Sequence, residues 1–271
     1  MKTNLLSKYQ SPASDGQTQL ITPNKANWKY VYFETKEIQK NQTISIKSDA
    51  NEVCLVVLSG KCNISTSELN LTEIGDRMSP FDRVKPWAVY INQNDFIELK
   101  ALSSLEIAIC RAPGGGDYPA RIISPDKIGS EKRGKGHNQR LVHNILPETE
   151  AANSLLVVEV FTDEGNTSSY PSHKHDVDNY PYETYLEETY YHRFSPNQGF
   201  AFQRVYTEDG SIDESMAVYD KDVVMVPKGY HPVATVAGYN NYYLNVMAGP
   251  VRKWCFTWEN DHNWINGESY N

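Results

Sequence analysis

The chain has 271 residues and a mass of 30.8 kDa, a length that fits one large domain or two compact ones. Hydrophobic residues make up 39% and charged residues 22%, which excludes a disordered or fibrous chain. The net charge of −8 offers no general attraction to a polyanion, so we expect no nucleic-acid partner.

No apolar stretch approaches the roughly 20 residues of a membrane-spanning helix, so we expect no membrane partner. The first twelve residues contain only Leu5-Leu6 as an apolar run, too short for a signal peptide. The four cysteines form no Cys-x-x-Cys pair and are expected to be small core residues. We therefore expect a soluble cytoplasmic protein with reduced thiols.

Short segments rich in β-branched and aromatic residues recur along the chain, separated by Gly, Pro, Asn and Asp, a pattern typical of strands. The expected strands are residues 28–33, 43–46, 52–58, 87–91, 104–110, 155–161, 189–194, 200–206, 216–219, 222–226 and 242–246. Helical periodicity is almost absent, and only residues 148–153 favour a helical turn. The predicted fold class is all-β.

Residues 113–136 are polar and contain three consecutive glycines and a charged run, which indicates a linker or an exposed crossover. The β-rich stretch on each side has the size of one barrel or jelly roll. We therefore predict two β-modules, residues 1–120 and residues 121–271.

All seven histidines lie at or after position 137, so a transition-metal site would belong to the second module. His173 and His175 are two residues apart, which on a strand points both imidazoles to the same side. Glu188 opens an aromatic strand, and His231 follows a strand and a Pro-x-Gly turn, which is the order of the cupin motifs. Three imidazoles and one carboxylate suit Zn, Mn, Fe, Co or Ni and leave positions for substrate oxygens.

The sequence resembles the 5-deoxy-glucuronate isomerases of inositol catabolism. These are bicupins related to the 4-deoxy-L-threo-5-hexosulose-uronate ketol-isomerases of pectin breakdown. The resemblance is carried by residues 168–176, 185–191, 199–207, 223–233 and 242–249. It is dense from about Arg140 to Trp264 and thinner in the first half.

The resemblance implies a bicupin of two β-barrel or jelly-roll modules, with an N-terminal cupin-like module that has no metal site. The implied reaction is the metal-assisted aldose–ketose isomerisation of 5-deoxy-D-glucuronate to 2-deoxy-5-keto-D-gluconate. The implied ligands are His173, His175, Glu188 and His231. Zinc is the expected metal, with Mn, Fe, Co and Ni as alternatives.

Four features depart from the general cupin pattern. The spacer between His175 and Glu188 is longer, Ser195 replaces a glycine, and Lys221 stands where the second motif opens with glycine. One residue instead of two separates the glycine of the turn from its histidine. Glu187 is the rival ligand, but strand alternation points only one of the pair inward, and the spacing to Ser195 favours Glu188.

An aldose–ketose isomerisation removes a proton beside a carbonyl and stabilises the resulting enediolate, which a metal achieves as a Lewis acid. Tyr190 and His192 share the strand face of Glu188, so each is a candidate acid or base, with simple packing as the alternative. The substrate carboxylate calls for a cation or an amide, and the candidates are Gln203 and Arg204, on opposite faces of one strand. Candidates for hydrogen bonds to sugar hydroxyls are Tyr170, Tyr185, Tyr206 and Tyr242, although most of the 18 tyrosines are expected to be packing residues.

Two alternatives stay open at this point. An isomerase of the pectin-derived uronate would differ in its substrate contacts and not in its metal ligands. A sugar-binding bicupin would bind its ligand without turnover. The expected partner is a small-molecule uronate, and assembly into a homo-oligomer is left open.

Overall fold

The structure, a computed structural model, describes residues 4–265. The chain divides into two compact units. The N-terminal unit comprises residues 9–129 and 143–158, and the C-terminal unit comprises residues 4–8, 130–142 and 159–265. Strands dominate both units, and the helical elements in the described part are all short. They are α1 (Pro23–Ala26), η1 (Pro80–Asp82), η2 (Gly136–Asn138) and η3 (Asn263–Ile265).

The N-terminal unit is built from a six-stranded and a four-stranded antiparallel sheet. The first sheet contains, in order, β11 (Arg121–Ile123), β8 (Ala88–Ile91), β5 (Asn51–Ser59), β10 (Leu105–Pro113), β3 (Tyr32–Ile38) and β2 (Gln17–Ile21). The second contains β4 (Thr43–Lys47), β9 (Phe96–Ala101), β6 (Cys62–Ser65) and β7 (Asn70–Ile74). Side chains of both sheets form one buried apolar cluster, as in a β-sandwich.

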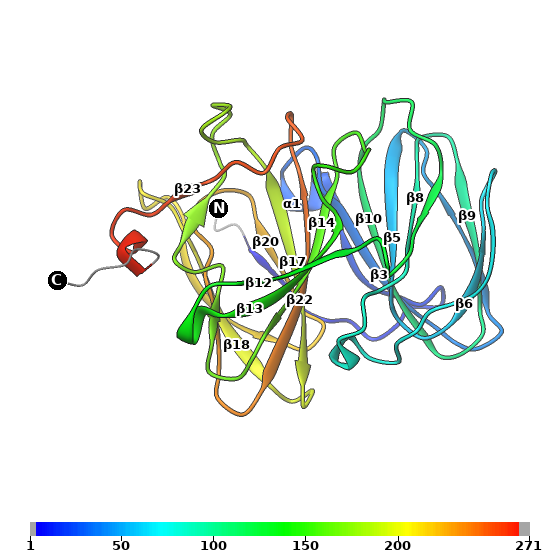
Figure 1. Cartoon of the computed structure of the whole chain (residues 1–271), viewed down its shortest axis with the longest axis horizontal. Helices are drawn as coiled ribbons and strands as arrows, with labels where there is room; N and C mark the ends of the chain where they lie inside the picture. Colours follow the sequence, from blue (N-terminus) through cyan, green and yellow to red (C-terminus); the bar gives the residue numbers. More distant parts are fainter. Residues whose placement is uncertain (1–3, 266–271) are drawn as a thin grey trace. The chain divides into compact units, whose positions relative to one another are not determined.

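The C-terminal part contains three further sheets (Figure 1). A seven-stranded sheet runs in the order β1 (Leu6–Ser7), β20 (Val223–Val226), β17 (Glu187–Ser195), β22 (Asn240–Ala248), β14 (Leu156–Thr162), β13 (Arg140–Leu146) and β12 (Gly129–Arg133). A four-stranded sheet contains β15 (Thr167–Ser168), β21 (Val233–Thr235), β18 (Phe200–Tyr206) and β19 (Asp213–Tyr219). The third sheet pairs β16 (His173–Lys174) with β23 (Thr257–Trp258).

The all-β prediction is confirmed, and most expected strands are present with shifted ends. The expected strand 28–33 is an exception, because β3 begins only at Tyr32. Asn27 adopts a left-handed conformation with φ 57°, and the Trp28 indole N–H donates to the Val31 carbonyl, which makes this segment a turn. Residues 148–153 form turns and no helix.

The expected linker 113–136 is also partly wrong, because it contains two strands. β11 pairs with β8 inside the N-terminal unit, and β12 extends the seven-stranded sheet. The two units do not divide at a single point between residues 120 and 121, because each unit contains segments from both sides of that point. Residues 4–8 belong to the C-terminal unit, where Leu6 and Ser7 pair with β20. Among the described residues, no helix is long and apolar enough to cross a membrane.

Candidate active site

Two of the candidate ligands come from β16 and the residue that follows it. His173 pairs with Trp258 of β23, and its ring lies 5.0 Å from that of Phe256 and 5.7 Å from that of Trp258. The carbonyl of His175 accepts a hydrogen bond from the Leu186 amide at 2.9 Å. Both imidazoles are buried, so the pairing holds them away from solvent.

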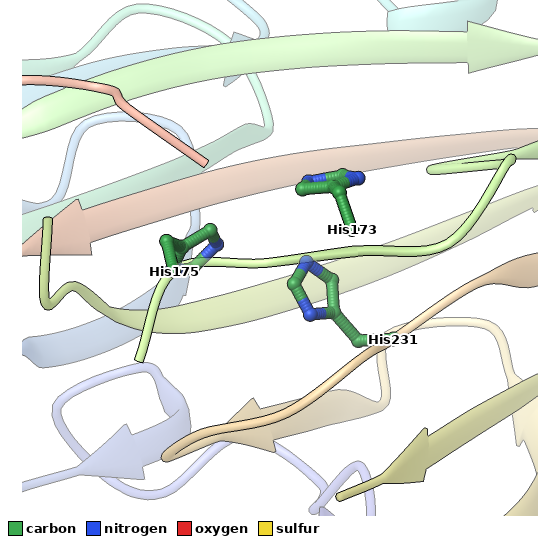
Figure 2. Close-up of side chains that lie close together, drawn as sticks. All are labelled: His173, His175 and His231. Atoms are coloured by element: carbon green, nitrogen blue, oxygen red, sulfur yellow. The ribbon is translucent and has the colours of Figure 1, made fainter. Parts of the chain in front are cut away.

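The third imidazole is delivered by the Pro-x-Gly turn after β20. Gly229 has φ 90°, and a Cβ at this position would lie 2.4 Å from the Tyr206 carbonyl oxygen, so only glycine fits. The turn carries His231, which is fully buried. Figure 2 shows the rings of His173, His175 and His231 gathered together, with His231 on a separate segment.

One nitrogen from each of His173, His175 and His231 lies within 4.8 Å of the others, a spacing that can hold one metal ion. Glu188 completes the set, since its Oε2 lies 3.1 Å from Nε2 of His175 and 3.3 Å from Nε2 of His231. Glu187, the rival, lies on the other face of β17, where its Oε1 accepts from the Tyr185 hydroxyl at 3.4 Å. The structure therefore brings together the four residues expected to bind metal.

The hydrogen bonds around these imidazoles suit metal ligands. Nδ1 of His175 lies 2.9 Å from the Leu186 carbonyl oxygen, and Nδ1 of His231 lies 2.8 Å from that of Gly229. Because a carbonyl only accepts, each Nδ1 carries a proton, and each Nε2 is left facing Glu188, where it can bind a metal in the neutral ring. A cation between the Nε2 atoms and the carboxylate would satisfy all three groups.

Two buried nitrogens of the cluster support the same conclusion. Nδ1 of His173 and Nε2 of His231 have no hydrogen-bond partner among the described residues. Buried polar atoms are nearly always paired, so atoms without partners here fit a role in binding a ligand. The donor set of imidazoles and one carboxylate fits a divalent transition metal.

The electrostatics of the cluster keep His173 and Glu188 in the form that binds a metal and favour a proton on His175. Burial, followed by the neighbouring His231 and His175, lowers the pKa of His173 well below its ordinary value. Burial opposes the charge of Glu188, but the contacts with His175 and His231 outweigh it and lower the pKa of the carboxyl to about 2. Burial also opposes a charge on His175, yet the hydrogen bond to Glu188 raises the pKa of His175 overall.

The two candidate acid–base residues lie beside the cluster, on the face of β17 that carries Glu188. The Tyr190 ring lies 5.7 Å from that of His231, and its hydroxyl lies 3.0 Å from Ser169 Oγ. Burial, together with the charge of Glu188, raises the pKa of Tyr190 well above its ordinary value. The phenol is therefore protonated at neutral pH.

His192 is fully buried one step further along the same face and stacks on Tyr190 at 6.0 Å. Its Nε2 lies 3.0 Å from Oε1 of Gln203, and its Nδ1 lies 3.3 Å from Oδ1 of Asn241. Burial lowers the pKa of His192 to about 4, so the ring is neutral at pH 7. Both ring nitrogens are thus engaged by amide side chains.

The predicted substrate-binding residues fall into separate places. Gln203 is buried beside His192, and its Nε2 lies 3.5 Å from the His231 carbonyl oxygen. Arg204 points to the opposite face of β18, where its exposed side chain pairs with Asp213 at 2.8 Å. Tyr242 also lies on a different face from the cluster, since it packs against Phe161 at 5.2 Å and its neighbour Tyr243 faces Tyr190. The structure brings only Gln203 together with the histidines.

Tyr206 and Arg204 line a pocket of about 560 Å³. The Tyr206 hydroxyl donates to Ser172 Oγ at 2.8 Å, next to His173. Tyr170 is half-buried, with its ring 6.0 Å from that of His262. The complete lining is Arg204, Tyr206, Thr207, Glu208, Tyr230, Glu259, Asn260, Asp261 and His262.

Some residues near the cluster were not predicted from the sequence. Tyr243 pairs with His192 across β17 and β22 and lies 5.0 Å from the Tyr190 ring, which the strand register could have indicated. Arg140 acts electrostatically on His173 and on both of these tyrosines, although it lies in β13, more than 30 residues before the first ligand. No local pattern singles it out.

Lys221 keeps the backbone role of the glycine that it replaces. It has φ 67°, and its amide donates to the His192 carbonyl at 2.7 Å. The departure from the cupin pattern therefore leaves the turn before β20 intact.

Comparison with known proteins adds direct relatives. The model of the KduI/IolB family matches residues 5–265. A protein of Geobacillus kaustophilus named 5-deoxy-glucuronate isomerase is 54% identical over 97% of this chain and 95% of its own length. A protein of Bacillus subtilis with the same name is 46% identical over 96% of this chain and 98% of its own length.

The solved structures agree. The crystal structure of an IolB-like protein from Salmonella typhimurium LT2 superposes with a TM-score of 0.95 at 55% identity, covering 97% of this chain and all of that one. A variant of Bacillus subtilis oxalate decarboxylase reaches a TM-score of 0.66 at 10% identity, covering 95% of this chain and 80% of that one, which shows a shared fold alone. Together with the strand order, these matches confirm the bicupin fold and the expected resemblance, and the chain belongs to the KduI/IolB family.

Proposed function

We propose that this protein is a metal-dependent aldose–ketose isomerase that converts 5-deoxy-D-glucuronate to 2-deoxy-5-keto-D-gluconate. The relatives named 5-deoxy-glucuronate isomerase support the substrate and the reaction. The observation that carries the metal dependence is the convergence of His175 and His231 on Glu188, with both Nδ1 protons held by backbone carbonyls.

His173, His175, Glu188 and His231 would hold the metal. When bound, a divalent metal supplies Lewis-acid polarisation of the substrate carbonyl and stabilises the negative charge of the enediolate. Zinc is the first candidate because three imidazoles and one carboxylate suit it, with Mn, Fe, Co and Ni as alternatives. Elemental analysis of the purified protein decides between them.

Tyr190 would act as the acid of the reaction. Its phenol stays protonated, so it can donate a proton to the oxygen that gains charge in the enediolate. The adjacent Ser169 hydroxyl and the Tyr243 ring hold its position. A Tyr190→Phe variant removes only the hydroxyl, and we expect its kcat to fall about 100-fold.

His192 remains the candidate base, since its neutral ring can accept a proton. Gln203 and Asn241 hold both of its nitrogens, and Gln203 also reaches the His231 carbonyl. The link from His192 through Gln203 to the His231 carbonyl also suits a second role for His192, in which it positions His231 and takes no part in proton transfer. A normal kcat in His192→Gln would remove His192 from the chemistry.

The proposal is tested by proton NMR of the purified protein with 5-deoxy-D-glucuronate in deuterated water. Appearance of keto product signals would support the isomerase, and deuterium at the transferred position would support an enediol with an exchanging base. If no conversion occurs with metal present, the pectin-derived uronate is the next substrate. Failure with both substrates would favour sugar binding without turnover. The cytoplasmic location stays a prediction, and the oligomeric state is left open.

A further inference from the structure

Arg140, the first residue of β13, is a half-buried cation that forms no ion pair in the described part of the chain, although the charge of Glu131 acts on it from beyond ion-pair distance. Its Nη1 donates to the Asn138 carbonyl at 3.1 Å, and that is the one hydrogen bond that its guanidinium makes within residues 4–265. A guanidinium has five N–H donors, so four are left for a ligand. Because burying a cation without a counter-ion is costly, this arrangement indicates an anion that binds from solution.

The local backbone makes room for this guanidinium. Gly134 has φ 78°, and a Cβ there would lie 2.8 Å from Arg140 Nη1 and 2.2 Å from the Asn138 carbonyl oxygen. Asn138 is buried, and its Nδ2 donates to the Tyr170 carbonyl at 3.4 Å, three residues before His173. The arginine is thus tied to the segment that carries the first metal ligand.

The charge of Arg140 reaches the groups proposed to act on the substrate. After burial and the two other histidines, Arg140 is the next cause that lowers the pKa of His173. Burial also lowers the pKa of Arg140 itself, while Tyr243 and Tyr190 act in the opposite direction. Arg140 is therefore close enough to His173 and to both tyrosines for its charge to act on them.

Three other arginines of this unit could bind a carboxylate, but each already has a carboxylate partner in the protein. Arg133 pairs with Glu131 at 2.6 Å and lies 4.7 Å above the Trp254 ring. Arg193 pairs with Asp220 at 3.0 Å. Arg204, the anchor expected from the sequence, is paired with Asp213 and exposed. Arg140 alone of these four combines partial burial with the lack of a carboxylate partner.

We propose that Arg140 is the residue that binds the carboxylate of the sugar acid, with the carbonyl end of the same molecule at the histidine cluster. The planar guanidinium matches a carboxylate with two parallel hydrogen bonds. Anchoring the acid end fixes the distance between the reacting carbons and the proton-handling groups, which contributes to the rate as well as to specificity. This inference rests on the proposed function, because it concerns the substrate of the same site.

The test compares two sugars that differ only at the anchored end. These are 5-deoxy-D-glucuronate and 5-deoxy-D-glucose, which carries a hydroxymethyl group in place of the carboxylate. In Arg140→Gln we expect KM for the uronate to rise about 100-fold, with no change in kcat/KM for the neutral sugar and with metal content unchanged. An equal loss with both sugars would overturn the proposal, since it would indicate a structural role.

Three further variants keep the result decisive. Arg140→Lys retains the charge but loses the planar fork, so we expect KM for the uronate to rise about tenfold; an unchanged KM would overturn the proposal. Arg193→Gln is the matched control for loss of a partly buried arginine and should leave the ratio between the two sugars unchanged. If Arg204→Gln raises KM for the uronate and Arg140→Gln does not, the anchor is Arg204.

A binding measurement separates this inference from the proposed function. Calorimetric titration with D-glucuronate and D-glucose requires no turnover. Binding of D-glucuronate that is at least tenfold weaker in Arg140→Gln, in a protein that isomerises none of the uronates, would refute the isomerase and support the anchor. Equal binding by wild type and variant, in a protein that does isomerise 5-deoxy-D-glucuronate, would refute the anchor alone.

Discussion

Each unit contains a fully or almost fully buried glutamate, and the two differ in what surrounds them. In the N-terminal unit, Glu52 accepts hydrogen bonds at 2.6 Å from the amides of Asn153, Ser154 and Leu155, and one at 2.5 Å from the Tyr90 hydroxyl. In the C-terminal unit, Glu188 meets two imidazole nitrogens whose rings have their protons on the opposite side.

The difference distinguishes a carboxylate paired within its own chain from one that faces candidate metal ligands. Glu52 is satisfied by its own chain, so it closes a loop and needs nothing from solution. Glu188 faces the Nε2 atoms of His175 and His231, and the cluster includes buried nitrogens without hydrogen-bond partners among the described residues. A cupin-like sheet can thus hold a buried glutamate either for internal hydrogen bonding or for binding a ligand, and the donors around the carboxylate decide between these roles.

Substitutions in the histidine cluster should have the largest effect, on both bound metal and activity. We expect His173→Ala and His231→Ala to lose bound metal and to lower kcat/KM on the order of 1,000-fold, equivalent to about 4 kcal/mol. Circular dichroism should remain β-like, because the change removes a ligand and not a strand. Metal content is measured by elemental analysis.

His137→Ala is the control for that experiment, since His137 belongs to the same unit but is exposed. It should retain metal and activity. Unchanged metal stoichiometry in both His173→Ala and His231→Ala would contradict the site.

The next largest effect is a loss of folding stability when Glu52 is replaced. Glu52→Gln keeps the shape but replaces a charged acceptor of four hydrogen bonds with an amide, one end of which is a donor. We expect the free energy of unfolding to fall by about 3 kcal/mol, measured in urea. Activity per folded molecule should not change, and a matching loss of bound metal would argue against a purely structural Glu52.

The sequence predicted which candidate ligands lie together better than it predicted their surroundings. Alternation and spacing selected Glu188 over Glu187, and the histidine order selected the candidate ligands that the structure brings together, because metal binding requires particular residue types. Arg140 escaped prediction because its proximity to His173 depends on how distant strands pair. The two-residue strand β1 escaped for the same reason, since Leu6 and Ser7 pair with Val224 and Val223, more than 200 residues away.

A third effect, of similar size, concerns acid stability. The pKa of fully buried His192 is lowered from 6.5 to about 4, so the unfolded chain binds a proton there that the folded chain does not. The resulting stability is complete above pH 6.5 and is lost as the pH falls toward 4, in total about 3 kcal/mol. In His192→Gln this contribution is absent.

We therefore expect the difference in unfolding free energy between wild type and His192→Gln to shrink as the pH falls from 6.5 to 4. Urea titrations at four pH values measure it. Parallel pH curves for the two proteins would show that His192 titrates normally in the folded state.

The smallest effect tests how the N-terminal strand is held on the C-terminal unit. Lys8 Nζ lies 2.9 Å from Oδ2 of buried Asp222 and 4.6 Å from the centre of the Tyr219 ring. Because the lysine side chain is half exposed, we expect Lys8→Met to lower the free energy of unfolding by only about 0.5–1 kcal/mol. Lys40→Met, at an exposed position of the other unit, should have no effect.

Salt provides the sharper readout for Lys8. At 1 M NaCl the Debye length falls to about 3 Å, so most of the charge interaction is screened and wild type and Lys8→Met should become nearly equal in stability. A difference that persists in high salt would mean that Lys8 stabilises the strand through packing of its aliphatic stem on Tyr219. In that case Lys8→Ala should cost more than Lys8→Met, because alanine removes the stem as well as the charge.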